Sequence, residues 1–235
     1  MSYVSAMVFK ILEKFGIRIL KNQYYNYLIC PNIMELLNKY KVECDSVLHI
    51  GGHLAEEASL YKRNGITAAT FIEGDPAIFP EMQAVLASYP QYSGISAMLS
   101  NKEGVSDFYV ASNVGASSSI LAPGCHLTER PDIKFDEVKK VETVTLDSLS
   151  LGEYDLVVID VQGAEQKVLE GGMETISKAK AIWVEVNAGS MYEGDANSSD
   201  IVASLSDFFV PCYINMSENL WGDALFIRKS SIGHK

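Results

Sequence analysis

From residue 45 onward, short runs of apolar residues alternate with segments in which apolar residues recur at helical spacing. This alternation is typical of a parallel β-sheet with helices on both faces. The sequence predicts strands of one sheet at 47–50, 69–73, 95–99, 156–160, 182–187, 212–215 and 224–228. It predicts helices at about 53–64, 76–88, 165–170 and 199–209. We therefore expect an α/β domain with a seven-stranded, mostly parallel sheet.

Two segments depart from this alternation. Residues 105–146 hold a polar loop with Ser and Pro between two further strands, predicted at 108–110 and 141–146. A loop of this length is usually functional or disordered. The last two strands of the sheet are joined by a connection too short for a crossover helix, so they should pair antiparallel. A parallel sheet that ends in an antiparallel hairpin is the pattern of the Rossmann-like class I methyltransferase fold, and the dinucleotide-binding fold lacks it.

The pattern predicts a helical N-terminal extension at 1–44 and a catalytic domain at 45–235. Between residues 4 and 19 apolar side chains recur at helical spacing, while Lys10, Lys14 and Lys21 gather on another face. We expect this amphipathic helix to pack against the domain or a second subunit, which would make a homo-oligomer through the N-terminal helices. A membrane surface is the alternative. A second helix is predicted to begin after Pro31.

Composition and charge limit the partners and the compartment. The chain has 19 Lys and Arg against 30 Asp and Glu, a formal net charge of -11. Phosphate backbones and anionic lipids would be repelled, so nucleic acid is not an expected substrate. Its four cysteines lie far apart, no apolar run is long enough for a transmembrane segment, and charged residues interrupt the first twenty positions. We expect a cytoplasmic protein.

The residues after the first two strands point to a nucleoside cofactor. In an open parallel sheet, ligands bind at the carboxyl ends of the strands, where Gly51 and Gly52 follow the first strand. Glycines let the backbone turn tightly there. Glu73 closes the second strand about twenty residues later, the spacing at which an acid reaches ribose hydroxyls. If Gly51 and Gly52 formed only a tight turn, Glu73 would have no role.

The cofactor is indicated by what the turn lacks. The phosphate-binding pattern G-x-G-x-x-G is absent, and no basic side chain is placed to hold a pyrophosphate. S-adenosyl-L-methionine carries no phosphate. The turn therefore favours adenosylmethionine over a dinucleotide.

Several motifs between residues 45 and 228 resemble those of the FkbM-type methyltransferases. The motifs are Val47-Leu48-His49-Ile50-Gly51-Gly52-His53, Phe71-Ile72-Glu73-Gly74-Asp75-Pro76, Ser117-Ser118-Ser119-Ile120-Leu121, Val144-Thr145-Leu146-Asp147 and Ile159-Asp160-Val161-Gln162-Gly163-Ala164-Glu165. Glu185-Val186-Asn187, Trp221-Gly222-Asp223-Ala224-Leu225 and His126 are similar to one branch of that family. The resemblance implies methylation of an acceptor hydroxyl, often on a sugar or a secondary metabolite.

The resemblance also implies a cofactor site. Gly51 and Gly52 would border the methionine part, Glu73 with its neighbour Gly74 would bind the ribose side, and Ser100 would lie near the adenine. Asp160 would face the reacting methyl group. Two positions depart from the family pattern: His49 replaces the usual acid of the first strand, and Ala55 replaces a common glycine. We expect His49, if protonated, to bind the methionine carboxylate.

A hydroxyl acceptor must lose a proton, so a base is expected within hydrogen-bond reach of it. Asp160 is the first choice because it ends a strand at the ligand-binding edge, and His126 is the second catalytic candidate. Asp160 as a helix N-cap and His126 as a surface residue are the alternatives. The residues expected to bind the acceptor are Ser119, His126, Glu185, Asn187 and Asp223.

A divalent metal is possible but is not favoured. The oxygen-bearing side chains of Asp160, Glu185, Asn187 and Asp223 are of the kind that magnesium and calcium prefer, but no compact motif such as an EF-hand loop is present. A zinc site at His49 and His53 is rejected because His49 belongs to a strand.

Two other functions remain open on the sequence alone. An NAD-type oxidoreductase would also place Gly51 and Glu73 on a cofactor. It should, however, have the phosphate-binding pattern that this sequence lacks, and it should not have the terminal antiparallel hairpin. A non-catalytic module that keeps the fold to bind a partner is favoured by the departures at His49 and Ala55.

Overall fold

The computed structural model of the chain describes residues 32–187, 190–216 and 221–232. Its compact units are Met1–Leu36 and Leu37–Lys235. The helix predicted between residues 4 and 19 lies outside the described residues. The helix predicted after Pro31 is present as α3 (Ile33–Tyr40). The boundary between 44 and 45 stays a prediction. Within the described residues, no helix has the length and apolarity needed to cross a membrane.

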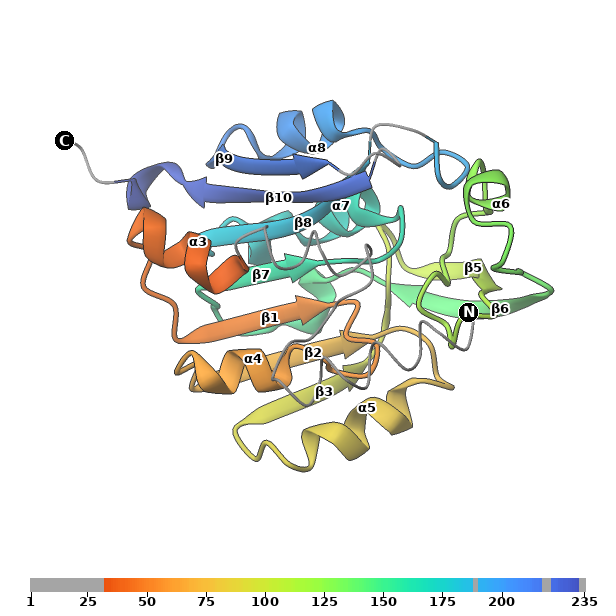
Figure 1. Cartoon of the computed structure of the whole chain (residues 1–235), viewed down its shortest axis with the longest axis horizontal. Coiled ribbons are helices and arrows are strands. Elements are labelled where there is room, and N and C mark those ends of the chain that lie inside the picture. The colour runs from red at the N-terminus through yellow and green to blue at the C-terminus, as the bar shows by residue number, and fades with distance from the viewer. Residues whose placement is uncertain (1–31, 188–189, 217–220, 233–235) are drawn as a thin grey trace, which may run out of the picture. The chain divides into compact units, whose positions relative to one another are not determined.

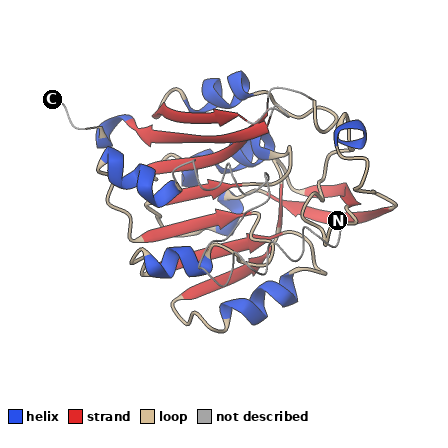
Figure 2. Cartoon of the chain, viewed as in Figure 1, coloured by secondary structure: helices blue, strands red, loops and turns tan. Residues whose placement is uncertain are grey.

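The main sheet has seven strands in the order β3-β2-β1-β7-β8-β10-β9 (Figures 1 and 2). The strands are β1 (Ser46–Ile50), β2 (Ala68–Glu73), β3 (Tyr92–Ser96), β7 (Leu156–Ile159), β8 (Ala181–Asn187), β9 (Phe209–Met216) and β10 (Trp221–Arg228). The first five of these pair in parallel, while β10 is antiparallel to both β8 and β9. The predicted parallel sheet with a terminal antiparallel hairpin is confirmed.

The strand predicted at 95–99 is divided between two sheets. The main sheet keeps β3, which ends at Ser96, and the Ala97 amide still donates to the Glu73 carbonyl. Beyond it, β4 (Met98–Leu99) joins β6 (Glu137–Val144) and β5 (Gly104–Val110) in a three-stranded sheet. The arrowheads of β1, β2 and β7 in Figure 1 point toward this small sheet. An apolar run does not reveal that its pairing partner changes halfway.

The helices between the strands confirm the predicted alternation but differ in length. They are α4 (Ala58–Arg63), α5 (Phe79–Leu86), α6 (His126–Glu129), α7 (Glu165–Ile176) and α8 (Ser198–Leu205), with short 3-10 helices at Asp147–Leu149 and Lys229–Ser231. Helix α4 begins later than predicted because His53 and Ala55 have positive φ angles of 41° and 55°. Helix α7 extends past Gly171, where a Cβ would lie 2.3 Å from the Ser100 carbonyl oxygen. Glycine therefore permits close packing there.

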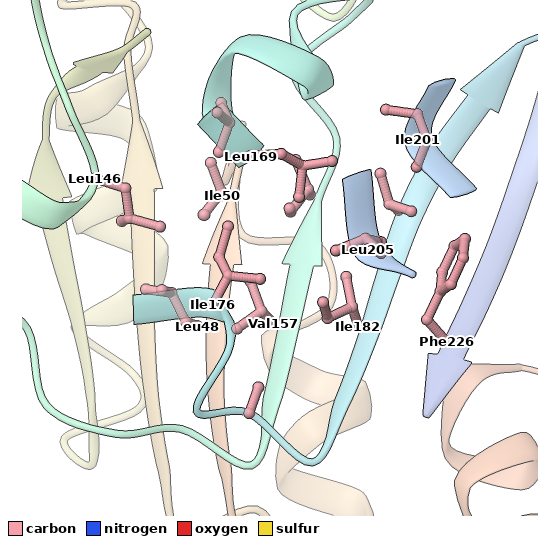
Figure 3. Packing of buried hydrophobic residues seen from close by; sticks show 14 of the residues in the cluster. Leu48, Ile50, Leu146, Val157, Leu169, Ile176, Ile182, Ile201, Leu205 and Phe226 are labelled. Carbon is pink, nitrogen blue, oxygen red and sulfur yellow. The ribbon is translucent and has the colours of Figure 1, made fainter. Parts of the chain in front are cut away.

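Helices α7 and α8 cover one face of the main sheet and enclose an apolar cluster with it (Figure 3). From the sheet, alternate residues of β1, β7 and β8 point into it, among them Ile50, Val157 and Ile182. Leu169 of α7 and Leu205 of α8 meet them and are fully buried. This packing fixes the carboxyl ends of β1 and β7 side by side.

The turn after β1 is bonded to the strands on both sides of it. The amides of Gly51 and Gly52 both donate to the Ile72 carbonyl at 2.9 Å, and the Asp160 amide donates to the Ile50 carbonyl at 3.0 Å. Gly51 has a φ of +86°, and a Cβ on it would lie 1.6 Å from the Asp160 carbonyl oxygen. No side chain fits at this position.

We predict that Gly51→Ala lowers the free energy of unfolding by more than about 3 kcal/mol, because strain at positive φ is added to an overlap with backbone. Gly65→Ala is the matched control, since Gly65 has a φ of +83° but a Cβ on it would have no atom within 4 Å. It should cost only about 1 kcal/mol. Urea unfolding measures both values, and equal losses would contradict the crowding argument.

Candidate active site

Glu73 joins the turn after β1 to the turn after β2. Its Oε2 accepts the His53 backbone N–H at 2.7 Å, and its Oε1 accepts the Asp75 backbone N–H at 2.6 Å. The side chain is buried, and burial raises the pKa of this carboxyl while the two amides lower it. Glu73 therefore lies where the sequence placed it, at the carboxyl edge beside the glycine turn, and it fixes the geometry of both turns.

The glycines of these turns leave room for methionine side chains that pack against them. A Cβ on Gly52 would lie 2.7 Å from the sulfur of Met82, and one on Gly74 would lie 2.7 Å from the sulfur of Met98. These packing contacts add to the predicted reason for glycine, which was a tight turn of the backbone. The cofactor roles of these glycines stay predictions.

His49 lies in a buried aromatic group. Its Nδ1 is 2.8 Å from the Tyr61 hydroxyl, and its ring stacks on Phe71 at 5.2 Å between centroids. Burial lowers the pKa of His49 to about 4, against a weaker opposing effect of Asp160. The imidazole is therefore neutral near pH 7. The expected contact between a protonated His49 and a carboxylate does not fit this environment.

The backbone at Ala55 explains why a glycine suits this position. Ala55 has a φ of +55°, a region that alanine enters at a cost of about 1–2 kcal/mol. Glycine would relieve this strain, but it would lose a buried methyl group worth about 0.8 kcal/mol and add about 0.4–1 kcal/mol of chain entropy to the unfolded state. These effects nearly cancel, so alanine is tolerated here.

Asp160 follows β7 at the same edge of the sheet, and its side chain is exposed to solvent. It does not cap α7, whose N-cap residue is Ala164 and has no side-chain cap. The turn is closed instead by Glu165, whose Oε1 accepts the backbone N–H groups of Val161 and Gly163 at 3.0 and 3.1 Å. The alternative that Asp160 is the N-cap of α7 is therefore wrong, and its side chain does not cap this helix.

Carboxyl groups from three elements surround this point. One oxygen each of Asp160, Glu165 and Glu185 lies within 4.8 Å of the others. Asp223 of β10 is the direct cross-strand neighbour of Glu185. Like charges at such a pair repel. Burial and then the charges of the other acids raise the pKa of Glu185, and burial and then neighbouring Asp160 raise the pKa values of Glu165 and Asp223 to about 7.

The predicted acceptor residues Glu185 and Asp223 are thus brought to Asp160. Asn187 lies on the same strand as Glu185, buried, and its Nδ2 donates to Asp195 at 3.2 Å. Its Oδ1 has no partner among the described residues.

The remaining predicted residues lie in other surroundings. His126 is buried in α6, with its ring against Phe135 and Tyr192, and its Nδ1 has no partner in the described part of the chain. It is not a surface residue. Ser119 is buried and its hydroxyl accepts the Leu121 amide, while Ser100 is buried under Gly171 of α7.

The three carboxylates of Asp160, Glu165 and Glu185 are of the type that a hard cation such as magnesium accepts. Glu165 takes the place of the predicted Asn187 and Asp223 in this group. Its oxygen Oε1 is already used by two backbone amides. The expectation that no metal is needed stays a prediction.

Comparison with known proteins identifies the family of the chain. The profile of the methyltransferase FkbM domain matches residues 45–209. The chain belongs to the FkbM methyltransferase family. A curated relative, 2-O-methyltransferase NoeI of Sinorhizobium fredii, is 30% identical over 173 residues, which cover 69% of this chain and 71% of the relative. The protein is therefore a methyltransferase.

A solved structure shows the same fold. Methyltransferase FkbM from Methylobacillus flagellatus matches with a TM-score of 0.51 and 14% sequence identity. The match covers 78% of this chain and 43% of that protein, so the chain spans less than half of its length. The family, together with the terminal hairpin, excludes the NAD-type oxidoreductase.

Three residues of the site were not singled out by the sequence. Gln162 and Glu165 belong to a motif that was quoted only as a resemblance, and a search for acids near Asp160 would have found Glu165. Tyr192 lies 32 positions after Asp160 and is brought to it only by the fold. No sequence signal marks it.

His53 links the glycine turn to the long loop after β5. Its Nδ1 is 2.8 Å from Glu56 Oε1 and its Nε2 is 2.9 Å from the Val114 carbonyl oxygen. Both partners only accept hydrogen bonds, so both ring nitrogens must carry protons. The hydrogen bond to Glu56 raises the pKa of His53 to about 9, against the effect of burial, and the charge of Glu73 adds to the rise. The imidazolium also faces Glu57.

This link should depend on pH. The folded-state pKa of His53 is above its unfolded value of about 6.5, so its stabilisation is complete below pH 6.5 and is lost as the pH rises through about 9. We predict that wild type loses about 1 kcal/mol relative to His53→Gln between pH 6 and pH 10, a value reduced for the solvent exposure of Glu56. Urea unfolding at both pH values measures it. A pH-independent difference would contradict the doubly protonated ring.

Proposed function

We propose that this chain is an S-adenosylmethionine-dependent O-methyltransferase that acts on a hydroxyl of a sugar, glycan or secondary metabolite. The observation that carries the proposal is that a solvent-exposed carboxylate, Asp160, lies beside the glycine turn at the carboxyl edge of the sheet. The name of the Sinorhizobium relative, a 2-O-methyltransferase, supports an oxygen acceptor.

The cofactor side fits adenosylmethionine. When bound, this cofactor supplies a methyl group on a positively charged sulfur. The residues proposed to hold it are those around the two turns. Glu73 has two carboxylate oxygens, and each has accepted one amide, so lone pairs remain for ribose hydroxyls. Gly51 and Gly52 would border the methionine part through their backbone, and acids such as Asp160 favour a cationic ligand.

On the acceptor side, Asp160 would receive the hydroxyl proton as the general base. Methyl transfer is an in-line displacement, so holding the acceptor oxygen in line supplies much of the acceleration. Burial and neighbouring acids raise the pKa of Glu185 and raise the pKa of Asp223 to about 7, which favours the protonated form of both carboxyl groups. They can then both donate and accept hydrogen bonds to a polyhydroxylated acceptor. Buried, neutral His126 is the second candidate base.

The test is methyl transfer by the purified full chain. Tritiated adenosylmethionine is incubated with a panel of p-nitrophenyl glycosides, and labelled glycoside is separated and counted. Calorimetry with S-adenosylhomocysteine runs in parallel. Label in at least one glycoside supports the proposal. Binding of adenosylhomocysteine without transfer to any hydroxyl compound would favour a different acceptor, and no binding would leave only the non-catalytic module.

We predict that Glu73→Gln weakens adenosylhomocysteine binding about 10-fold or more, because a charge-assisted hydrogen bond to ribose is worth about 1.5–3 kcal/mol. Isothermal calorimetry gives the Kd. Glu81→Gln on α5 makes the same chemical change elsewhere and should leave the Kd unaltered. Because Glu73 also holds two turns, the melting temperature of each variant is recorded. A folded Glu73→Gln variant with wild-type Kd would refute this pocket.

We predict that Asp160→Asn lowers kcat about 100-fold or more while the Kd of adenosylhomocysteine changes less than about 3-fold, because the amide cannot take a proton. Asp107→Asn on exposed β5 is the matched control. The best glycoside of the panel serves as acceptor. A wild-type kcat in Asp160→Asn would show that another group is the base, and His126 would be tested next.

A further inference from the structure

Gln162 has an unusual backbone conformation directly after Asp160. Its φ is +54°, a region that costs a non-glycine residue about 1–2 kcal/mol, and Gly163 follows with a φ of +93°. Such positions persist only where the surroundings enforce them, and they are concentrated at functional sites. Here the two amide hydrogen bonds to Glu165 enforce the turn. The strain places the Gln162 side chain among the acids.

The side-chain amide of Gln162 bridges two carboxylates. Its Nε2 lies 2.7 Å from Asp160 Oδ1 and 3.3 Å from Glu185 Oε2. An amide nitrogen carries two N–H donors, so each carboxylate can receive one. The reversed amide would aim its oxygen at both acids. The orientation is therefore set by the carboxylates, and Gln162 bridges Asp160 and Glu185, which also share a direct side-chain hydrogen bond.

Tyr192 connects this amide to the long loop after β5. The single proton of the Tyr192 hydroxyl lies between two acceptors, the Ser117 carbonyl oxygen at 2.8 Å and Gln162 Oε1 at 3.3 Å, and can be donated to either one. Its ring fills the space beside Gly163, where a Cβ would lie 2.7 Å from a ring carbon. Tyr192 is buried, so the link has no freedom to swing into solvent. A continuous set of contacts thus runs from Ser117 through Tyr192 and Gln162 to Asp160.

We propose that Gln162 is a positioning residue for methyl transfer, and that Tyr192 couples it to the loop at Ser117, so that the placement of this loop sets the direction of the Asp160 carboxylate. The inference rests on the proposed function, in which Asp160 is the base. The loop also carries Ser119 and His126, which are predicted to bind the acceptor, so a shift of Ser117 on acceptor binding would be transmitted to the base. Neither Gln162 nor Tyr192 needs to touch the reacting atoms for this role.

Kinetics with the best glycoside of the panel test the role. We expect Gln162→Ala to lower kcat about 10-fold, with the KM for adenosylmethionine within about 2-fold, because an imperfectly placed base slows transfer without removing the cofactor site. Gln166→Ala is the control. Gln166 lies in the first turn of α7. Its side-chain amide bonds Ser204 and Glu170 and not the acids around Asp160. Equal loss of kcat and cofactor affinity, or wild-type kcat, would overturn the proposal.

A double-mutant cycle tests the coupling. Tyr192→Phe keeps the ring that packs on Gly163 and removes only the hydroxyl. If Tyr192 acts through Gln162, the double variant Gln162→Ala/Tyr192→Phe should lose about as much kcat as Gln162→Ala alone. A loss equal to the product of the two single losses would show independent roles and overturn the coupling. Melting temperatures identify any variant that fails to fold.

A measurement without acceptor separates this inference from the proposed function. The side-chain amide protons of Gln162 are followed by NMR in the wild type and in Tyr192→Phe. We expect both signals to move in Tyr192→Phe and to stay in place in Tyr89→Phe, whose ring lies against Tyr92. Unmoved signals would overturn the coupling. Absence of methyl transfer by the wild-type chain would count against the proposed function instead.

Discussion

The close approach of β1 and β7 at their carboxyl ends is the constraint on which the site depends. Gly51 lies so near the Asp160 carbonyl oxygen that no Cβ fits between them, and the turn is hydrogen-bonded to β2 on one side and to Asp160 on the other. The parallel pairing of β1 with β7 sets their register, and the apolar face of α7 packs on the sheet beside them. Glu73 and Asp160 are therefore held on either side of one glycine turn.

Carboxylates perform two different tasks around this turn. Glu73 and Glu165 each accept hydrogen bonds from two backbone amides, so besides carrying charge they hold the adjoining turns in place. Such fixed polar groups need no reorganisation when a ligand arrives. Glu185 and Asp223 instead face each other across a strand pair without backbone amides on their carboxyl groups, and burial, then neighbouring acids, raise the pKa values of both. The first pair shapes the site, and the second can respond to what binds in it.

The sequence was sufficient where one residue or one strand end carries the information. Apolar runs predicted the sheet, the short connection predicted the hairpin, and strand ends predicted that Asp160, Glu185 and Asp223 would meet. It was insufficient where the structure depends on contacts with distant residues. The run at 95–99 divides between two sheets, and α7 continues through Gly171, where the Ser100 carbonyl oxygen packs too closely for a side chain. Tyr192 reaches Gln162 only through the fold. The charge state of His49 depends on burial, which spacing does not reveal.

The two departures from the family pattern, His49 and Ala55, are compatible with an active methyltransferase. His49 is hydrogen-bonded to Tyr61 and stacked on Phe71, so a neutral ring fills a position where an isolated buried acid would have been costly. Ala55 adopts the positive φ that favours glycine, and its buried methyl group offsets much of the strain. Both substitutions leave the Gly51 turn and Glu73 in place. They are changes beneath the site, so they do not separate this chain from a working methyltransferase.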